Sequence, residues 1–280
     1  MRPRVESDSM SGDPSGLIDQ RDPGILDAHF HVIDPNHPIR ANDGFLPDPF
    51  TVDDYLERTA GLNVTGGAVV SGSFQGFDQG YLVDALEKLG NSFVGVTQVP
   101  AEIADGEILE LDRAGVRAVR FNLRRGGSAE LADMVRLARR VYYLAGWHSE
   151  LYVEGRDLKG LFDRIAALPV ACVDHFGLER EGFGDLLRLV ESGVKVKASG
   201  FGRIDMDPSV AIREIANVDP TALMFGTDLP STRADRPFRG SDLELFGEVL
   251  GSADLEAVLR DNAEALYLKR PRVDAFNHDC

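Results

Sequence analysis

The sequence contains few cysteines, since only Cys172 and Cys280 occur among its 280 residues. One thiol lies inside an apolar run and the other at the end of the chain, so they do not form the disulfide framework of a small secreted protein. Two isolated thiols agree with a reducing compartment, and the sequence predicts a cytoplasmic protein. We expect Cys172 to be a small buried hydrophobic residue rather than a nucleophile.

Long apolar runs are also absent from this chain. No stretch is apolar for long enough to span a bilayer, which argues against a membrane protein. Residues 1–22 are polar, rich in Ser, Asp, Gly and Pro, and contain no apolar core of a signal peptide. We therefore predict a disordered N-terminal arm over 1–22, one folded domain over 23–270 and a C-terminal tail over 271–280.

Positive charge is scarce, because 30 Lys and Arg face 46 Asp and Glu, which gives a formal net charge of −16. Such a field repels polyanions and argues against nucleic acid or an anionic membrane surface as a partner. A small anionic substrate would need arginines gathered locally at its site. The composition does not set the oligomeric state, and a homo-oligomer is compatible with it.

The chain does contain a regular alternation of short apolar runs and amphipathic stretches. We expect strands over 25–32, 66–71, 93–99, 118–123, 149–153, 170–175, 194–199 and 223–226. We expect helices over 52–60, 80–89, 107–114, 131–144, 158–167, 183–191, 208–215 and 243–266. Eight such units in roughly 250 residues predict a single-domain α/β fold, the (β/α)8 TIM barrel. An open doubly wound sheet is the alternative, but its Gly-x-Gly-x-x-Gly fingerprint is missing.

Four polar residues fall at the ends of expected strands. The strand period of two places His29 and His31 on one face, and His175 and Asp228 end or follow the sixth and eighth expected strands. A single His-x-His pair more often caps a strand beside an ordinary loop. Because the carboxyl ends of barrel strands share one face, where catalytic groups gather, the four residues together predict an active site.

These residue types support two kinds of chemistry. Three imidazoles and a carboxylate can hold one divalent ion such as Zn²⁺ or Mn²⁺, which acidifies a bound water. Without a metal, the same groups can act as hydrogen-bond donors and a general base. The spacing does not separate these alternatives, and no bridging lysine is apparent at the end of the fourth or fifth expected strand.

Arginines give a second indication of function. Arg120 lies inside the fourth expected strand, Arg124 and Arg125 follow it, and Arg203 follows the seventh. A guanidinium facing a barrel mouth suits bidentate binding of a carboxylate, although each arginine could instead pair with one of the many acidic side chains. Several arginines around one mouth favour an anionic substrate, which Ser73, after the second strand, could help to orient.

Five segments, in this order, resemble the amidohydrolase superfamily, and most closely its branch of pyrone dicarboxylate lactonases. They are Asp27-Ala-His-Phe-His31, Gly115-Val-Arg-Ala-Val-Arg-Phe-Asn122, Val173-Asp-His-Phe-Gly177, Lys195-Val-Lys-Ala-Ser-Gly200 and Phe225-Gly-Thr-Asp-Leu-Pro230. The resemblance spans roughly residues 24–268. It implies a distorted (β/α)8 barrel that hydrolyses lactones or related carboxylate-bearing substrates, without a metal in the pyrone dicarboxylate enzymes.

The resemblance also implies roles for individual residues. By motif position it assigns the catalytic set to His29, His31, His175 and Asp228. It assigns substrate contacts to Tyr152, Arg120 and Arg203. A further substrate-binding arginine is expected after the fourth strand, at Arg124 or Arg125, where the spacing departs from the family pattern, and Arg180 is another candidate.

We therefore predict a metal-independent hydrolase of a carboxylate-bearing lactone. Asp228 would accept a proton from water, and His29, His31 and His175 would donate hydrogen bonds to the developing oxyanion. The expected substrate contacts are Arg120, Asn122, Arg124, Tyr152, Arg203 and Ser73. One alternative is a mononuclear metal-dependent amidohydrolase or decarboxylase with the same His and Asp residues as ligands. Another is a non-catalytic protein that binds a carboxylate metabolite.

Overall fold

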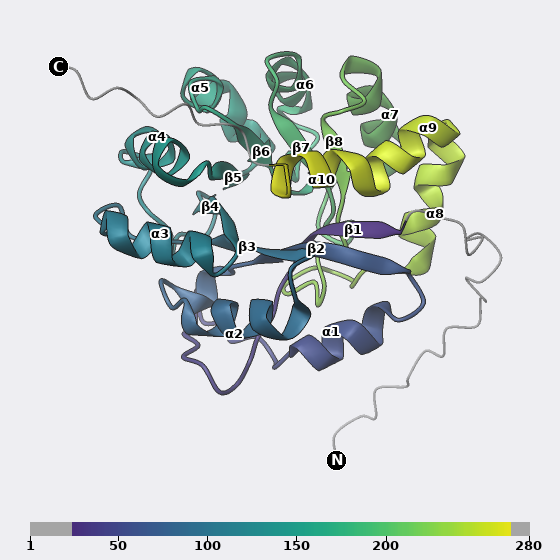
Figure 1. Ribbon diagram of the computed structural model, residues 1–280. Coiled ribbons are helices and arrows are strands. Elements are labelled where there is room, and N and C mark those ends of the chain that lie inside the picture. Colours follow the sequence, from purple (N-terminus) through teal and green to yellow (C-terminus); the bar gives the residue numbers. More distant parts are fainter. Residues whose placement is uncertain (1–23, 270–280) are drawn as a thin grey trace.

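The computed structural model describes residues 24–269 of the chain. Eight strands form one parallel sheet in the order of the sequence and curl into a barrel, with the helices arranged around it (Figure 1). The predicted single-domain TIM barrel is confirmed. The strands are β1 Ile25–Phe30, β2 Val64–Val70, β3 Phe93–Thr97, β4 Val116–Asn122, β5 His148–Tyr152, β6 Ala171–Val173, β7 Lys195–Ala198 and β8 Leu223–Phe225. The predicted arm over 1–22 and the tail over 271–280 lie outside the described residues.

One helix follows each strand, and further short helices complete the chain. The barrel helices are α1 Val52–Thr59, α2 Gly80–Leu89, α3 Asp105–Arg113, α4 Met134–Ala145, α5 Gly155–Ala166, α6 Phe183–Glu191, α7 Pro208–Val218 and α8 Gly240–Val249. Two short turns of helix, η2 Ser73–Gln75 and η3 His175–Gly177, follow β2 and β6. Between residues 24 and 269, no helix has both the length and the apolar content to cross a membrane.

The single helix expected over 243–266 is wrong. This region contains the end of α8, then α9 Ser252–Glu256, the π-helical turn η4 Ala257–Asp261 and α10 Asn262–Tyr267. Leu250 and Gly251 both have extended backbone angles, so α8 ends there and Gly251 caps the start of α9. The apolar periodicity of the sequence continues across this break, which is why it did not reveal the break.

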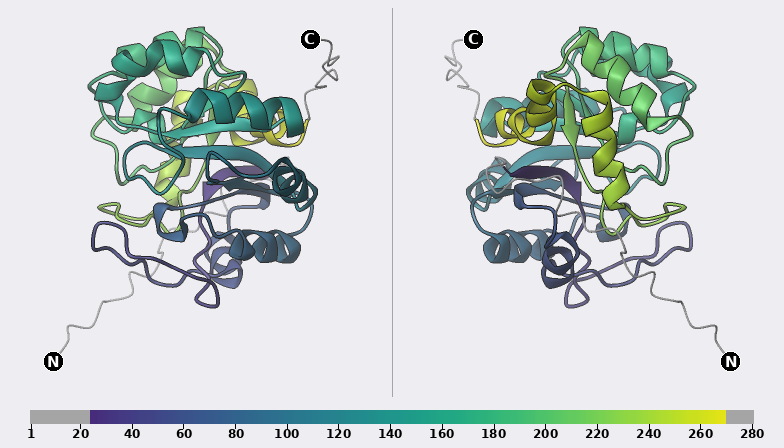
Figure 2. Two further views of the ribbon diagram at one scale, coloured as in Figure 1. Left: turned by 90° about the vertical axis from the view of Figure 1, so that its left-hand side faces the viewer. Right: turned by 90° about the vertical axis from the view of Figure 1, so that its right-hand side faces the viewer.

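Apolar residues form two layers, one inside the barrel and one between the strands and the helices. The inner layer consists of small or slender side chains from the strands and is covered by Tyr267 of α10. Cys172 belongs to this layer and is fully buried, as predicted. In the left view of Figure 2, α10 (yellow) lies at one end of the barrel, and the long loops after β1 and β8 extend from the other. The open end therefore carries the loops that follow the strands.

Hydrogen bonds to Asp27 join the two strands that close the barrel. Thr227, just after β8, donates its backbone N–H and its hydroxyl to the Asp27 carboxylate on β1, at 2.9 and 2.7 Å. The hydroxyl of Tyr55 on α1 also donates to this carboxylate, at 3.0 Å. The backbone N–H of Asp228 donates to the carbonyl of His29 at 2.7 Å. These bonds fix the ends of β1 and β8 against each other where the predicted catalytic residues lie.

A β-bulge in β1 directs the two histidines of that strand. The register shifts between Asp27 and Phe30, so that one extra residue opposes β2. Phe30 faces outward and stacks on Tyr55 with ring centroids 3.7 Å apart. His29 and His31 both face the barrel interior, as the period of two predicts. Bulges of this kind often re-aim side chains beside active sites.

Candidate active site

The Asp228 carboxylate lies at the centre of three imidazoles. Its Oδ1 atom is 3.7 Å from Nε2 of His31, 3.7 Å from Nε2 of His175 and 3.9 Å from Nε2 of His29. All four residues are buried. Within the described part of the chain, Asp228 Oδ1 and His29 Nε2 have no hydrogen-bond partner. The structure thus brings together the four residues that the sequence places at strand ends, although β1 and β6 end before His31 and His175.

Arg203 binds the other oxygen of the same carboxylate. Its Nε and Nη2 donate to Asp228 Oδ2 at 2.9 and 2.6 Å. Burial would raise the pKa of Asp228, but the charge of Arg203, followed by the influence of His175, outweighs burial and holds this pKa well below its usual range. Asp228 is therefore a carboxylate with one oxygen bound to Arg203 and one oxygen free.

Burial disfavours the charged form of two of the surrounding imidazoles, His29 and His175. Burial lowers the pKa of His175 to about 3, and Asp228 only partly opposes this effect. Burial also lowers the pKa of His29 well below its usual range, and the charge of Lys197 lowers it further. His31 Nδ1 lies 2.6 Å from the carbonyl of Val70 and must donate to it. The other ring nitrogen, Nε2, therefore faces the site, 3.7 Å from Asp228 Oδ1.

Lys197 on β7 is a site residue that the sequence reasoning missed. Its ammonium group is fully buried, forms an ion pair with the Glu150 carboxylate on β5, and lies 3.4 Å from Nδ1 of His29. Nδ1 of His29 also lies 3.3 Å from Asp174 Oδ1, which only accepts, whereas the ammonium group only donates. A hydrogen bond from Lys197 places the proton of this neutral imidazole on Nε2, facing Asp228, and a hydrogen bond to Asp174 places it on Nδ1. The signal available in the sequence was a lysine inside a short strand that must be buried on both faces.

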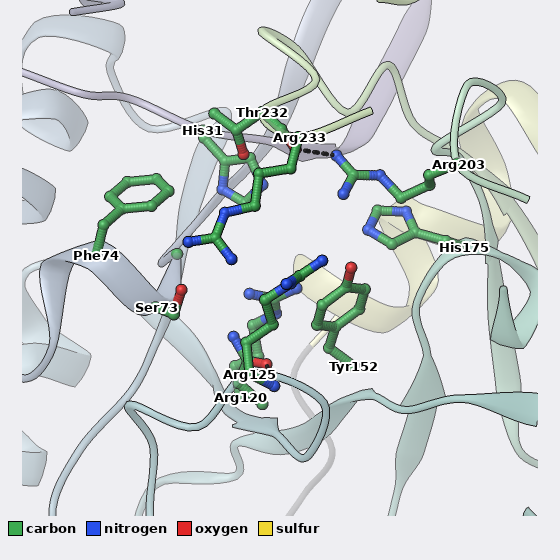
Figure 3. A pocket seen from close by; sticks show the side chains of 12 residues that line it. His31, Ser73, Phe74, Arg120, Arg125, Tyr152, His175, Arg203, Thr232 and Arg233 are labelled. Atoms are coloured by element: carbon green, nitrogen blue, oxygen red, sulfur yellow. Dashed lines mark hydrogen bonds between the residues drawn. The ribbon is translucent and has the colours of Figure 1, made fainter. Parts of the chain in front are cut away.

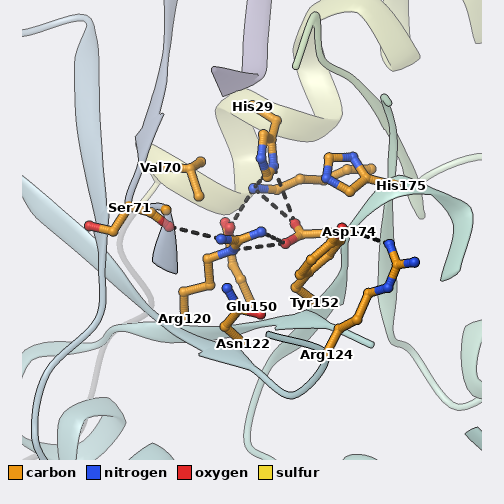
Figure 4. A network of polar contacts seen from close by, with 12 residues as sticks. His29, Val70, Ser71, Arg120, Asn122, Arg124, Glu150, Tyr152, Asp174 and His175 are labelled. Carbon is orange, nitrogen blue, oxygen red and sulfur yellow. Dashed lines mark hydrogen bonds and ion pairs between the residues drawn. The ribbon is translucent and has the colours of Figure 1, made fainter. Parts of the chain in front are cut away.

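Asp174 was also missed, although it precedes His175 directly in the sequence. Its carboxylate accepts hydrogen bonds from Arg120 at 3.0 Å, and Arg120 also donates to the carbonyl of Ser71 at 2.8 Å (Figure 4). The Arg120 guanidinium lies 5.0 Å from the centre of the Tyr152 ring. Arg120 is thus buried, its charge is balanced by Asp174, and it is held against the Tyr152 ring.

A pocket opens above these groups (Figure 3). Among the predicted residues, its lining contains His31, Ser73, Arg120, Asn122, Tyr152, His175 and Arg203. Of the two arginines after β4, Arg125 lines the pocket, whereas Arg124 instead donates to the Tyr152 hydroxyl at 3.1 Å and to Glu154 at 2.7 Å. Arg180 is exposed and is not part of the lining. Phe74, Thr232 and Arg233 also line the pocket and were not predicted.

The donor set suits a divalent metal ion by residue type. Ligand atoms of His29, His31 and Asp228 lie within 4.8 Å of one another, and so do those of His29, Asp174 and His175. Imidazole nitrogens and a carboxylate oxygen are typical Zn²⁺ ligands. Three atoms of these groups, Asp228 Oδ1, Asp174 Oδ1 and His29 Nε2, have no hydrogen-bond partner among the described residues, which is consistent with this use. Ligation through His29 Nε2 would require the proton of this imidazole on Nδ1, where Asp174 Oδ1 lies 3.3 Å away.

Comparison with known proteins gives consistent matches. The amidohydrolase family model Amidohydro_2 matches residues 26–269. A 2-pyrone-4,6-dicarboxylate hydrolase of Comamonas testosteroni is 28% identical over 275 residues, which cover 87% of this chain and 90% of the relative. A 4-sulfomuconolactone hydrolase of Hydrogenophaga intermedia is 26% identical over 273 residues, covering 88% and 89%. The crystal structure of a putative 2-pyrone-4,6-dicarboxylic acid hydrolase from Pseudomonas putida is 26% identical, with a TM-score of 0.72 and coverage of 87% and 97%.

Proposed function

Because this chain belongs to the amidohydrolase family, we propose that it hydrolyses the ester bond of a lactone that carries an anionic group. One observation carries the proposal: a buried, ionised Asp228 has one free oxygen directed at three imidazole nitrogens. A carboxylate in this position can take a proton from a water molecule. Both named relatives are lactone hydrolases, and this supports the substrate class.

In the proposed reaction, water attacks the carbonyl carbon of the lactone. Asp228 Oδ1 accepts a proton from this water, the ring C–O bond breaks, and the proton passes to the departing ring oxygen. The Nε2 proton of His29 donates to the oxyanion that develops on the carbonyl oxygen. His31, held by the hydrogen bond from its Nδ1 to the Val70 carbonyl, places Nε2 beside Asp228, where it can orient the water. The product is the ring-opened acid.

The pairing of Asp228 with Arg203 couples this reaction to substrate binding. A carboxylate bound by a guanidinium at 2.6–2.9 Å is a weak base. A substrate carboxylate that attracts Arg203 shares the guanidinium with Asp228 and weakens this ion pair. The proton affinity of Asp228 then rises in the complex with substrate, when a base is needed.

Replacement of Asp228 by Asn tests the proposal. The change keeps the shape of the side chain and removes the base, so we expect kcat for a carboxylate-bearing lactone to fall roughly 10²- to 10⁴-fold. A matched control, Asp185→Asn, alters a carboxylate on α6 that forms a local ion pair with Arg188 at 3.2 Å and does not line the pocket, and it should retain activity. Near-normal turnover by Asp228→Asn would refute the role of Asp228. Absence of hydrolysis by the unaltered protein, with unchanged carboxylate binding in Asp228→Asn, would indicate a binding protein.

The unpartnered atoms of the site favour a second candidate, a one-metal hydrolase or decarboxylase. His29, His31, His175 and Asp228 would then hold a Zn²⁺ or Mn²⁺ ion, which would lower the pKa of a bound water. The two candidates differ in the tautomer of His29. Nitrogen-15 NMR of the imidazoles should find the His29 proton on Nε2 if the site works without metal. A proton on Nδ1, stoichiometric metal in the purified protein and loss of activity with a chelator would favour the metal.

A further inference from the structure

The arginines of the pocket fall into two groups that differ in how they are neutralised. Arg120 and Arg203 each bind a carboxylate that is fully buried, Asp174 and Asp228. Arg125 and Arg233 share a single carboxylate, that of Asp43, which lies 4.0 and 3.8 Å from them and is 69% exposed. Exposed ion pairs of this kind contribute little free energy, because water and salt screen the two charges. The second pair of arginines therefore keeps most of its capacity to bind an anion.

Arg125 and Arg233 reach the pocket opening from two different loops (Figure 3). Arg125 follows β4, and Arg233 lies in the loop between β8 and α8. Burial lowers the pKa of Arg233, and the positive charge of Arg125 lowers it further. Since two cations and one shared carboxylate leave an uncompensated positive charge here, an anion between the guanidinium groups would relieve their repulsion.

The surroundings of Arg233 hold its side chain in place. Its guanidinium lies 4.5 Å from the centre of the Phe45 ring and donates to the carbonyl of Asn42. Its backbone adopts φ 61°, a left-handed conformation that residues with a side chain rarely adopt. Strain of this kind is often retained where a side chain must be presented to a ligand. The protein carries a net charge of −16, so a fixed positive group here is a local exception.

We propose that Arg125 and Arg233 form an anion-binding subsite at the pocket mouth, which binds a carboxylate or sulfonate of the substrate remote from the ester bond. The inference rests on the proposed lactone hydrolysis. It makes Arg233 a specificity-determining residue, because its guanidinium selects substrates that carry this second charge. Arg120, held by Asp174 and the Ser71 carbonyl, then positions Tyr152 and Asp174.

Binding of non-hydrolysable anions tests the subsite independently of catalysis. Isothermal titration calorimetry would compare benzoate, isophthalate and 3-sulfobenzoate, which present one carboxylate, two carboxylates, or a carboxylate and a sulfonate on the same ring. The unaltered protein should bind both dianions more tightly than benzoate. Arg233→Gln should weaken dianion binding roughly 10- to 100-fold and leave benzoate binding unchanged. The relative affinity for isophthalate and 3-sulfobenzoate shows which anion the subsite prefers.

Two further variants control this experiment. Asp43→Asn removes the competing carboxylate from an exposed position, and it should tighten dianion binding about 2- to 5-fold. Arg180→Gln removes the same charge as Arg233→Gln from an exposed position outside the pocket, and it should change neither affinity. Thermal unfolding would verify that each variant is folded.

Several results would overturn the subsite. One is equal affinity of the unaltered protein for benzoate and the dianions, and another is unaltered dianion binding by both Arg233→Gln and Asp43→Asn. A loss of benzoate and dianion binding in the same proportion would instead show a general effect on the pocket. If dianion selectivity depends on Arg233 but no lactone is hydrolysed, the subsite stands and the proposed reaction fails.

Discussion

The buried ion pair of Lys197 and Glu150 should make a large and context-dependent contribution to stability. Both side chains are fully inaccessible, and Glu150 also accepts a hydrogen bond from the Tyr267 hydroxyl at 2.6 Å. Lys197→Met keeps the length of the side chain but leaves the Glu150 carboxylate without its cation. Removing one partner of a buried pair costs about 3–5 kcal/mol. At about 2–4 °C per kcal/mol, the midpoint of thermal unfolding should fall by roughly 6–20 °C.

A double-mutant cycle separates the pair from the loss of packing. Glu150→Gln retains an acceptor for Tyr267 and removes the unpaired charge, so the double variant Lys197→Met/Glu150→Gln should recover a large part of the stability lost in Lys197→Met. Urea unfolding with an unchanged m-value gives the free energies. Because Glu150→Gln alone leaves the buried ammonium group of Lys197 unpaired, the two single losses should together exceed the loss of the double variant by about 3 kcal/mol or more.

Lys88→Met provides a matched surface control. Lys88 pairs with Asp34 at 3.8 Å and its side chain is 59% exposed, so its loss should cost less than about 1 kcal/mol. Equal stability of Lys197→Met and Lys88→Met, or a double variant whose loss is the sum of the single losses, would refute the reasoning. Lys197→Met should also lower kcat more than it changes KM, because His29 loses the donor that favours a proton on its Nε2 atom.

Two other predictions concern pH and backbone packing. At pH 5 the unfolded chain should bind two protons that the folded chain does not, at His29 and His175, whose ordinary pKa is about 6.5. The folded chain in turn binds up to one proton more at Asp27, whose pKa burial raises to about 6. The unfolded chain therefore binds about one more proton in total. Stability should therefore fall by about 1.4 kcal/mol per unit as pH decreases, and His175→Asn should bring this slope near zero in urea titrations. Gly182→Ala should lower the free energy of unfolding by several kcal/mol or prevent folding, because φ is +84° and the new Cβ would lie 1.8 Å from the first carbonyl oxygen of α5. In Gly184→Ala the new Cβ meets open space, so the midpoint of thermal unfolding should change little.

The barrel and the convergence of its four central residues could be predicted from the sequence, because both depend on the order of strands and helices along the chain. Eight alternating units define a parallel barrel, and a parallel barrel places every strand end on one face. His29, His31, His175 and Asp228 therefore converge without knowledge of any side-chain contact. The predicted ends of the strands were less accurate, since apolar residues continue past the last hydrogen bond between neighbouring strands.

Other site residues depend on information that the sequence pattern does not contain. Lys197 and Asp174 face the interior because of the register of β7 and the end of β6, and a one-residue shift would turn either side chain away. Arg233 reaches the pocket through a loop with left-handed residues at positions 228, 231 and 233. Such loop conformations follow from tertiary contacts, so arginines after strands, such as Arg124, Arg125 and Arg180, could not be ranked.

The charges beneath the pocket favour an anionic ligand over an added cation. Three carboxylates, those of Glu150, Asp174 and Asp228, contact three cations, which are Lys197, Arg120 and Arg203. With His29 and His175 neutral, these six charges balance. A divalent ion would add two positive charges to a buried and balanced site that also faces the uncompensated charge of the mouth arginines, and desolvation makes such an excess costly. A substrate anion, in contrast, adds the sign of charge that the mouth lacks, which supports metal-independent hydrolysis as the first proposal to test.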